Sequence, residues 1–197
     1  MGDRLLDAMA TAAARQYGGE PVSELAHSLQ CAELAAAAGA DEDLVLACLL
    51  HDVGRFAVDQ SGIRDRPLSI DSIRGSVPIG DQARAHHDVG AELVEPYVSP
   101  RVSWLVRMHA DAKRYLCTVE PEYRASLTPT SVYTLALQGG LMSAEEVRAV
   151  GSHPWLADAL ALRRWDDRAK APDAVTRPLG AWEPLLRAHF TRPRAAA

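Results

Sequence analysis

The sequence of 197 residues is poor in several features that define other classes of protein. No apolar run reaches the roughly 18 residues of a membrane-spanning helix, so we expect no membrane partner. Cysteine is scarce, since Cys31, Cys48 and Cys117 are the only three, and each lies in an apolar stretch with helical spacing. This odd number predicts reduced, buried thiols of a cytoplasmic protein rather than a disulfide framework.

An excess of positive charge is also missing. The 21 basic residues face 26 acidic ones, which gives a net charge of −5, and no basic stretch stands out that would neutralise a phosphate backbone. Nucleic-acid binding is therefore not expected. Hydrophobic residues make up 48% and charged residues 24% of the chain, which is the balance of a globular protein. The length favours one domain, or one domain with a tail.

Strand-like alternation of β-branched residues is scarce, whereas alanine and leucine are abundant and apolar residues recur at helical spacing. We therefore predict an all-α fold. Helices are expected over 4–15, 23–38, 44–52, 82–94, 100–111 (which 113–116 would extend), 130–138, after 143, over 154–169 and over 182–189. Ser23 fits an N-cap, Gly39 fits a helix end, and Ser143 with Glu146 fits a capping box. An irregular segment is expected over 53–80.

Four of the seven histidines stand out, namely His27, His51, His86 and His109. The pair His51-Asp52 closes the nearly all-apolar helix over 44–52, where an uncompensated buried carboxylate would cost several kcal/mol. Taken alone, each histidine is more typical of an ordinary core or surface residue. The set predicts a metal site, because helices of a bundle can direct several side chains at one interior point. Imidazoles and carboxylates without thiolate favour iron, manganese or cobalt over calcium.

The segments around these histidines, 25–32, 49–54 and 86–91, resemble one subgroup of the HD-domain superfamily of helical metalloproteins, as do 112–117, 135–140 and 162–167. This subgroup is that of the phosphonate-degradation HD proteins. They are mixed-valent di-iron oxygenases that cleave the carbon–phosphorus bond of 1-hydroxyphosphonates, and they are related to myo-inositol oxygenase. The resemblance covers residues 15–172. It implies an HD-domain helical bundle with a buried dinuclear metal site over 1–172, and a C-terminal extension over 173–197 that packs on this core or trails from it.

The resemblance also implies a ligand set for two irons in the mixed-valent Fe(II)/Fe(III) state, with O2 as co-substrate. One iron would be bound by His27, His51, Asp52 and Asp166, and the other by Asp52, His86 and His109, with Asp52 bridging the two. His86 is chosen over His87 because the family's ligand lies four residues before a glycine. Asp166 is chosen over Asp167 because the ligand directly follows an aromatic residue. Both choices stay open to a shift by one residue.

Cations are needed to bind the phosphonate group. The resemblance assigns this role to Lys113, one helical turn after His109, and to Arg163, about one turn before Asp166. Ser131, near a helix start, would donate to the same group. Without the resemblance, the two cations are more typical of ordinary solvated charges, and Ser131 of a helix-capping serine.

The glycine-rich loop over 16–22 carries two further candidates. In the family, an equivalent of Tyr17 occupies the iron site until substrate displaces it, and an equivalent of Glu20 holds the substrate's amino group. From the sequence alone, a surface loop with a packed tyrosine fits these residues better. Arg55 departs from the family, which commonly has histidine after His-Asp-x-Gly; it can still bind an anion, but it leaves the size or charge of the substrate open. Tyr17, His51 and Asp52 would be the catalytic residues.

The function implied is O2-dependent oxidative cleavage of the C–P bond of a small 1-hydroxyphosphonate. Glu20 favours (R)-2-amino-1-hydroxyethylphosphonate, which would give glycine and phosphate. An N-methylated analogue and hydroxymethylphosphonate remain alternatives for the substrate. Two other functions remain open: an HD phosphohydrolase acting on phosphate esters or nucleotides through a metal-activated water, and a non-catalytic HD module that senses a ligand. The oligomeric state is open, as is whether residues 56–80 fold over the site.

Overall fold

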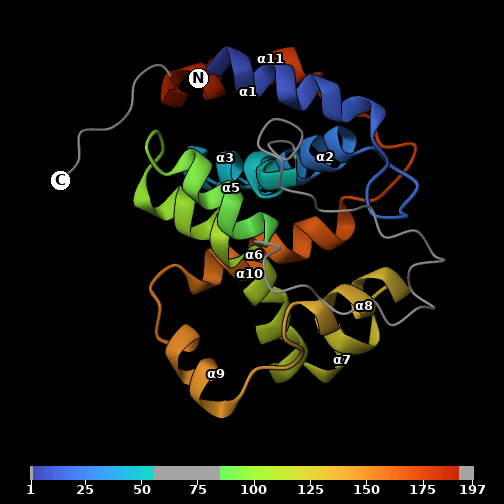
Figure 1. The fold of residues 1–197 in the computed structure, drawn as a ribbon, viewed down its shortest axis with the longest axis vertical. Coiled ribbons are helices and arrows are strands. Elements are labelled where there is room, and N and C mark those ends of the chain that lie inside the picture. The colour runs from blue at the N-terminus through green and yellow to red at the C-terminus, as the bar shows by residue number, and fades with distance from the viewer. Residues whose placement is uncertain (1, 56–84, 191–197) are drawn as a thin grey trace.

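The structure is a computed structural model that describes residues 2–55 and 85–190, and within these ranges it is built from helices (Figure 1). The helices are α1 (Gly2–Thr11), the 3₁₀ helix η1 (Ala12–Ala14), α2 (Glu24–Ala37), α3 (Glu42–Leu50), α5 (His86–Val94), α6 (Pro100–Val119), α7 (Pro121–Ala125), α8 (Pro129–Leu137), α9 (Ala144–Gly151), α10 (Leu156–Arg168) and α11 (Leu179–Phe190). The described residues contain no strand beyond an isolated bridge between Gln16 and Ser23. The predicted all-α class is confirmed. The irregular segment expected over 53–80 is wrong for residues 53–55, which form a helical turn, and its remainder over 56–80 lies outside the described residues.

Capping groups determine where several helices begin and end. The Ser23 hydroxyl accepts from the Ala26 N–H at 3.1 Å, and α2 ends before Gly39, whose φ of +76° suits glycine. Asp41 caps α3, so the negative charge that the helix dipole favours also satisfies a backbone donor. A capping box starts α9 at Ser143. The caps predicted at Ser23, Gly39 and Ser143 are confirmed.

Several elements differ from the prediction. The helix expected over 82–94 is interrupted at Ala85, whose backbone is extended, so that α5 begins at His86, and residues 82–84 lie outside the described residues. The helix expected over 100–111, which 113–116 would extend, runs without a break to Val119, since its last two turns bury Leu116 and Cys117. The short helix α7 was not predicted, because five residues after a proline carry too little periodicity to be identified.

Helix α3 lies at the centre of the bundle, in contact with α2, α6 and α10. Its side chains Leu46, Leu49 and Leu50 are fully buried, and each contributes about 1.5–3 kcal/mol to folding. Helix α11 packs against α1 and α3, and its Trp182 and Leu186 belong to the same core (Figure 1). A central helix without a polar face therefore delivers the residues that follow it, His51 and Asp52, into the interior.

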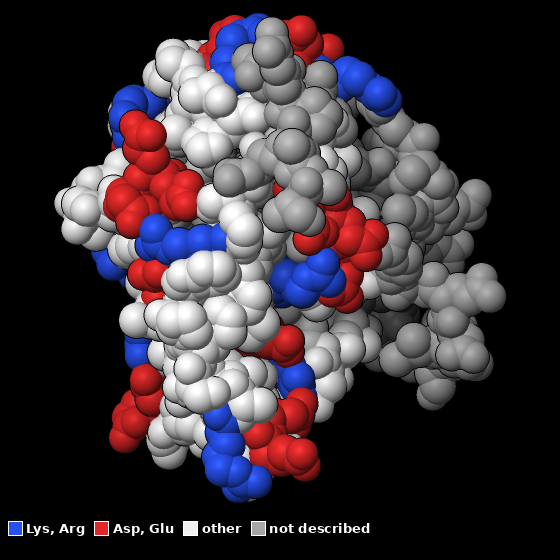
Figure 2. All heavy atoms as spheres, turned by 90° about the vertical axis from the view of Figure 1, so that its left-hand side faces the viewer, with Lys and Arg blue, Asp and Glu red and all other residues white. Residues whose placement is uncertain are grey.

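The surface is polar and mixed in charge. On the face drawn in Figure 2, acidic and basic side chains alternate over short distances. Ion pairs such as Arg114–Glu146, at 2.6 Å, follow from this mixture. Across the part of the chain that the structure describes, no helix combines the length and the apolar character needed to cross a lipid bilayer.

Gly54 marks a very close approach between two segments. Residues 53–55 form a helical turn directly after Asp52. A Cβ atom on Gly54 would lie 1.9 Å from the carbonyl oxygen of His86 and 2.8 Å from the backbone nitrogen of Gly90. The backbone of α5 therefore rests on Gly54, and this contact brings His86 to the His51-Asp52 pair.

We expect Gly54→Ala to destabilise the fold by about 1–3 kcal/mol, because the added methyl group must push α5 away. Denaturant unfolding monitored by circular dichroism measures the change. Gly180→Ala is the matched control, since a Cβ atom there meets nothing within 4 Å. Equal stability of Gly54→Ala and the wild type would contradict the close approach.

Candidate metal centre

The six residues predicted as metal ligands come together in the interior from five segments. They are His27 on α2, His51 and Asp52 after α3, His86 on α5, His109 on α6 and Asp166 on α10. All are buried except His86, which is half-buried. Helices distant in sequence thus direct six nitrogen or oxygen donors at one region of the bundle.

The first group of donors lies around His27. Its Nε2 atom is 3.0 Å from Nε2 of His51, 3.2 Å from Oδ1 of Asp166 and 3.8 Å from Oδ2 of Asp52. The Asp52 Oδ2 atom is also 3.5 Å from Nε2 of His51. These four side chains form one candidate pocket for an ion.

The second group of donors uses the other oxygen of the same aspartate. Oδ1 of Asp52 lies 3.1 Å from Nε2 of His86 and 3.7 Å from Nε2 of His109. The two Nε2 atoms are 3.2 Å apart. Asp52 therefore offers one oxygen to each group, the arrangement of a bridging carboxylate between two ions.

The protonation of the imidazoles fits a metal. The Nδ1 atoms of three histidines bond to backbone carbonyls at 2.7–2.8 Å, namely His27 to Ala169, His51 to Cys48 and His109 to Val106. Nδ1 must then carry the proton, so each Nε2 presents its lone pair to the interior. Lone pairs of His27 and His51 that face each other at 3.0 Å repel unless a cation lies beside them. Two donors bound at about 2.1 Å and roughly at right angles are about 3.0 Å apart, so the spacing suits a transition metal.

Two carboxylate oxygens also indicate a cation site. Oδ2 of Asp52 and Oδ1 of Asp166 are buried and have no hydrogen-bond partner among the described residues. Buried acceptors are normally satisfied, so each needs an explanation. A bound cation supplies one, because both atoms lie within the first group of donors.

Burial keeps the histidines neutral. It lowers the pKa of His51 and, together with the Arg55 charge, lowers the pKa of His86 to about 4. The pKa of His109 lies well below its ordinary value for the same reason, reinforced by the neighbouring imidazoles. At neutral pH these rings are therefore already in the form that binds a metal.

The carboxylates stay ionised although they are buried. Burial by itself would raise the pKa of Asp52, but Arg55 and the imidazoles outweigh it and hold the pKa well below its usual range. Arg163 and His27 do the same for the pKa of Asp166. Neutral imidazoles and ionised carboxylates together form a donor set of hard and borderline ligands that matches iron, manganese or cobalt.

Arg163, predicted to bind the phosphonate, is already paired in the structure. Its Nη1 donates to Oδ2 of Asp166 at 2.6 Å, and its Nε and Nη2 donate to Asp167. Tyr123 donates to Asp167 and also accepts from Nε of Arg163. In this arrangement Arg163 orients the candidate ligand Asp166, and its charge is balanced by two carboxylates.

Lys113 makes fewer polar contacts than Arg163. Its buried Nζ donates to Oγ1 of Thr134 at 2.8 Å, and among the described residues no carboxylate lies within 4 Å of it. Burial and the nearby Arg163 lower the pKa of Lys113 to about 7. The amine is therefore available to an incoming anion, which would favour its charged form.

Tyr17 and Arg55 lie over the centre. The Tyr17 ring stacks on His27, with centroids 3.8 Å apart and an angle of 15° between the planes. Burial and the nearby carboxylates raise the pKa of Tyr17 well above its ordinary value, so the hydroxyl stays protonated. Arg55 donates to Oδ1 of Asp52 at 3.0 Å, and its guanidinium lies 5.6 Å from the Tyr17 ring centroid.

Glu20 and Ser131 are connected through Thr128 and Lys170. Glu20 accepts from Oγ1 of Thr128 at 3.1 Å, and it lies 3.4 Å from Nζ of Lys170. Ser131 is buried one turn into α8, and its Oγ accepts from Lys170 at 3.3 Å. Thr128 caps α8, so the alternative interpretation of Ser131 as the capping residue is wrong.

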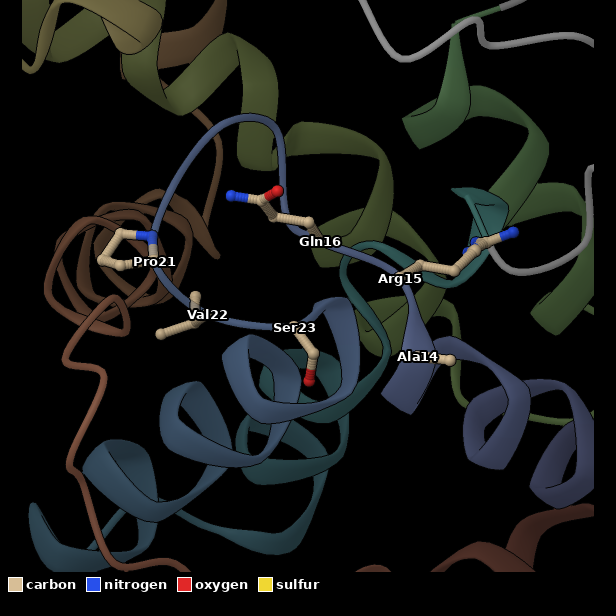
Figure 3. A pocket seen from close by; sticks show the side chains of 6 residues that line it. All are labelled: Ala14, Arg15, Gln16, Pro21, Val22 and Ser23. Carbon is tan, nitrogen blue, oxygen red and sulfur yellow. The ribbon is translucent and has the colours of Figure 1, made fainter.

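Two pockets open on the surface of the described chain. One of about 320 Å³ lies on the loop between residues 14 and 23, where Figure 3 shows its lining, and none of those residues is a predicted site residue. The other, of about 310 Å³, is lined by Ser131, Asp167 and Lys170 among others. The second pocket therefore adjoins the side chains predicted to bind the phosphonate.

Sequence reasoning missed several partners of the site. Asp167 was readable from its spacing of one helical turn from Arg163. Tyr123, Thr134 and Lys170 carried no local signal, because each meets its partner across a distance in sequence of 21 residues or more.

A helical bundle with a central His-Asp pair and two histidine groups around one aspartate defines a helical metalloprotein with places for two ions. The model of the HD domain matches residues 25–147. The 1-hydroxy-2-(trimethylamino)ethylphosphonate dioxygenase (glycine-betaine-forming) of Leisingera caerulea is 35% identical over 171 residues, which cover 87% of this chain and 81% of the relative. The hydroxymethylphosphonate dioxygenase of Gimesia maris is 36% identical over 151 residues, 77% of this chain and 69% of the relative.

The chain therefore belongs to the HD-domain family, and these two relatives within it are phosphonate dioxygenases. The predicted membership of the phosphonate-degradation HD oxygenases is confirmed at the level of the family.

After reconstitution with ferrous iron, we expect two ions per chain in the wild type and one in His86→Ala. We expect fewer than one ion per chain in Asp52→Ala, because Asp52 faces both groups of donors. Elemental analysis of the desalted protein measures the content. His153→Ala is the control, since that ring stacks on Trp104 and not on any of the six donors. Two ions retained by His86→Ala would count against the second position.

Proposed function

We propose that this protein is an O2-dependent dioxygenase that cleaves the C–P bond of a small 1-hydroxyphosphonate at a mixed-valent Fe(II)/Fe(III) pair. The observation that carries the proposal is the placement of Asp52, with one carboxylate oxygen facing each of two histidine groups. The similarity to two phosphonate dioxygenases supports the reaction type. His27, His51, Asp52 and Asp166 would hold one iron, and Asp52, His86 and His109 the other.

The irons, when bound, supply the redox chemistry with O2 that the protein side chains lack. The residues bind and orient the substrate. Lys113 and Ser131 would bind the phosphonate group, while Arg163, which donates to Asp166, would fix the orientation of that ligand. Tyr17 covers His27 and would have to move when substrate enters. In the absence of substrate, Tyr17 would therefore limit access to the centre.

The named relatives suggest two kinds of substrate, one with a cationic trimethylamino group and one with a bare hydroxymethyl group. Glu20 favours a substrate with an amino group, because its largely buried carboxylate can pair with an ammonium group, as it does with that of Lys170. We therefore propose (R)-2-amino-1-hydroxyethylphosphonate as the preferred substrate. One O2 converts it to glycine and phosphate, and this balances all atoms.

We also propose that residues 1–172 form the catalytic unit and that 173–197 are an extension packed on it through α11. A cytoplasmic location is supported by the cysteines. Cys31, Cys48 and Cys117 are all buried and free in the structure, and oxidising compartments favour disulfides.

Oxygen uptake and phosphate release by the ferrous-loaded protein test the reaction. The compounds are (R)-2-amino-1-hydroxyethylphosphonate, its N-trimethyl analogue, hydroxymethylphosphonate and a nucleoside monophosphate. We expect one phosphate per O2 from a hydroxyphosphonate. Phosphate released from the nucleotide without oxygen uptake would instead indicate a phosphohydrolase, and no turnover of any compound would indicate a non-catalytic module.

A pH profile tests the role of Lys113. Its charged form binds the anion and is lost as pH rises through about 7, so kcat/KM should fall by about tenfold per pH unit above that value. Lys113→Arg stays charged, and its profile should lack this fall. Titration of the substrate itself affects both proteins equally and is the internal reference. Identical slopes for the two proteins would show that Lys113 does not bind the phosphonate in its charged form.

A further inference from the structure

Glu20 and Lys170 form a largely buried ion pair. Nζ of Lys170 lies 3.4 Å from Oε1 of Glu20, and the side chains are only 12% and 13% exposed. The same Nζ donates to Oγ of Ser131 at 3.3 Å, while Glu20 accepts from Oγ1 of Thr128 at 3.1 Å. The Lys170 ammonium group thus lies between a carboxylate on the loop before α2 and the first turn of α8.

Both members of the pair are tied to the same candidate ligand. Tyr17, on the loop of Glu20, stacks on the His27 ring. Ala169, directly before Lys170, accepts the hydrogen bond from Nδ1 of His27 at 2.8 Å. The pocket of about 310 Å³ is lined by Lys170, Ser131 and Thr128. The ion pair is therefore connected to the first group of donors through Tyr17 on one side and Ala169 on the other.

The choice of lysine is unusual for this chain. The sequence has nineteen arginines and only two lysines, Lys113 and Lys170. Both side chains are largely buried, and their ammonium groups lie at Thr134 and at Glu20 respectively. An ammonium group is compact and mobile on its stem, whereas a guanidinium is a planar, rigid fork. The group that holds Glu20 is thus of the same chemical type as the ammonium group of an amino-substituted phosphonate.

We propose that Lys170 is a specificity-determining residue that occupies the Glu20 carboxylate and so weakens the preference for an ammonium-bearing 1-hydroxyphosphonate over one that has no ammonium group. Two cations that compete for one carboxylate repel each other at short range, and partial burial makes this repulsion stronger than in water. A substrate without an amino group leaves the pair intact. The inference rests on the proposed function and adds to it the residue that sets the choice among substrates.

The test compares two phosphonates in the ferrous-loaded protein. Dissociation constants for (R)-2-amino-1-hydroxyethylphosphonate and hydroxymethylphosphonate are measured by calorimetry without oxygen, and kcat/KM for both is measured with oxygen. In Lys170→Met we expect the preference for the amino compound to rise by about fivefold in both quantities. Lys170→Gln, which keeps a donor for Ser131 but removes the charge, should shift the preference in the same direction.

Two further variants serve as controls. Arg164→Met removes a cation that lines the same pocket but pairs with Glu120, so the preference should stay at the wild-type value. In a Glu20→Gln background, Lys170→Met should have no further effect on the preference, because the carboxylate for which the two cations compete is gone. Melting temperatures confirm that each variant is folded, and Lys170→Gln decides the test if the methionine variant does not fold.

An unchanged or lowered preference in the folded Lys170 variants would overturn the proposal. Equal weakening for both compounds would show instead that Lys170 binds the phosphonate group they share. If the wild-type protein binds and oxidises a hydroxyphosphonate but the Lys170 substitutions leave the preference unchanged, the proposed function stands and this inference alone is refuted. A wild type that neither binds nor oxidises either compound would refute both.

Discussion

The buried carboxylate of Asp52 is the constraint on which the rest of this structure depends. It is 1% exposed and ionised, which costs several kcal/mol unless positive charge surrounds it. Helix α3, which is apolar after its first turn, delivers it to the interior, and the glycine contact at residue 54 brings His86 to its Oδ1 atom. Arg55 supplies part of the compensation. The other oxygen, Oδ2, accepts no hydrogen bond in the described chain, and a bound cation would complete the compensation.

The histidines are oriented by two kinds of hydrogen bond, one local and one between distant segments. His51 and His109 each donate to a carbonyl three residues earlier on their own segment, so their orientation is set locally by the helix. His27 instead donates to Ala169, after the end of α10. This bond, together with two hydrogen bonds between Gln30 and Ala171, joins α2 to the segment that carries Asp166 and Lys170. The first group of donors therefore depends on tertiary packing to a greater degree than the second.

Local signals explain what could be predicted from the sequence. Caps, the apolar run before His51-Asp52 and the helical spacing specify the elements, and they place histidines on four of them. Partners that meet across long sequence separations could not be read in this way. Arg163 was expected to face the substrate, yet the structure shows it bound to Asp166 and Asp167, because side-chain pairing in the interior depends on which helices meet.

The cations around the centre differ in how firmly they are paired, and this divides their tasks. Arg163 contacts two carboxylates and Arg55 contacts Asp52, so moving either would expose a buried negative charge. Lys113 is held by a single neutral hydroxyl. When a cation binds an anionic substrate, the contacts that it already makes are broken, and their free energy must be subtracted from that of the new contact. The net binding free energy is therefore most favourable for the cation with the weakest existing contacts. The arginines are thus suited to holding the carboxylates in place, and the lysine to meeting the substrate.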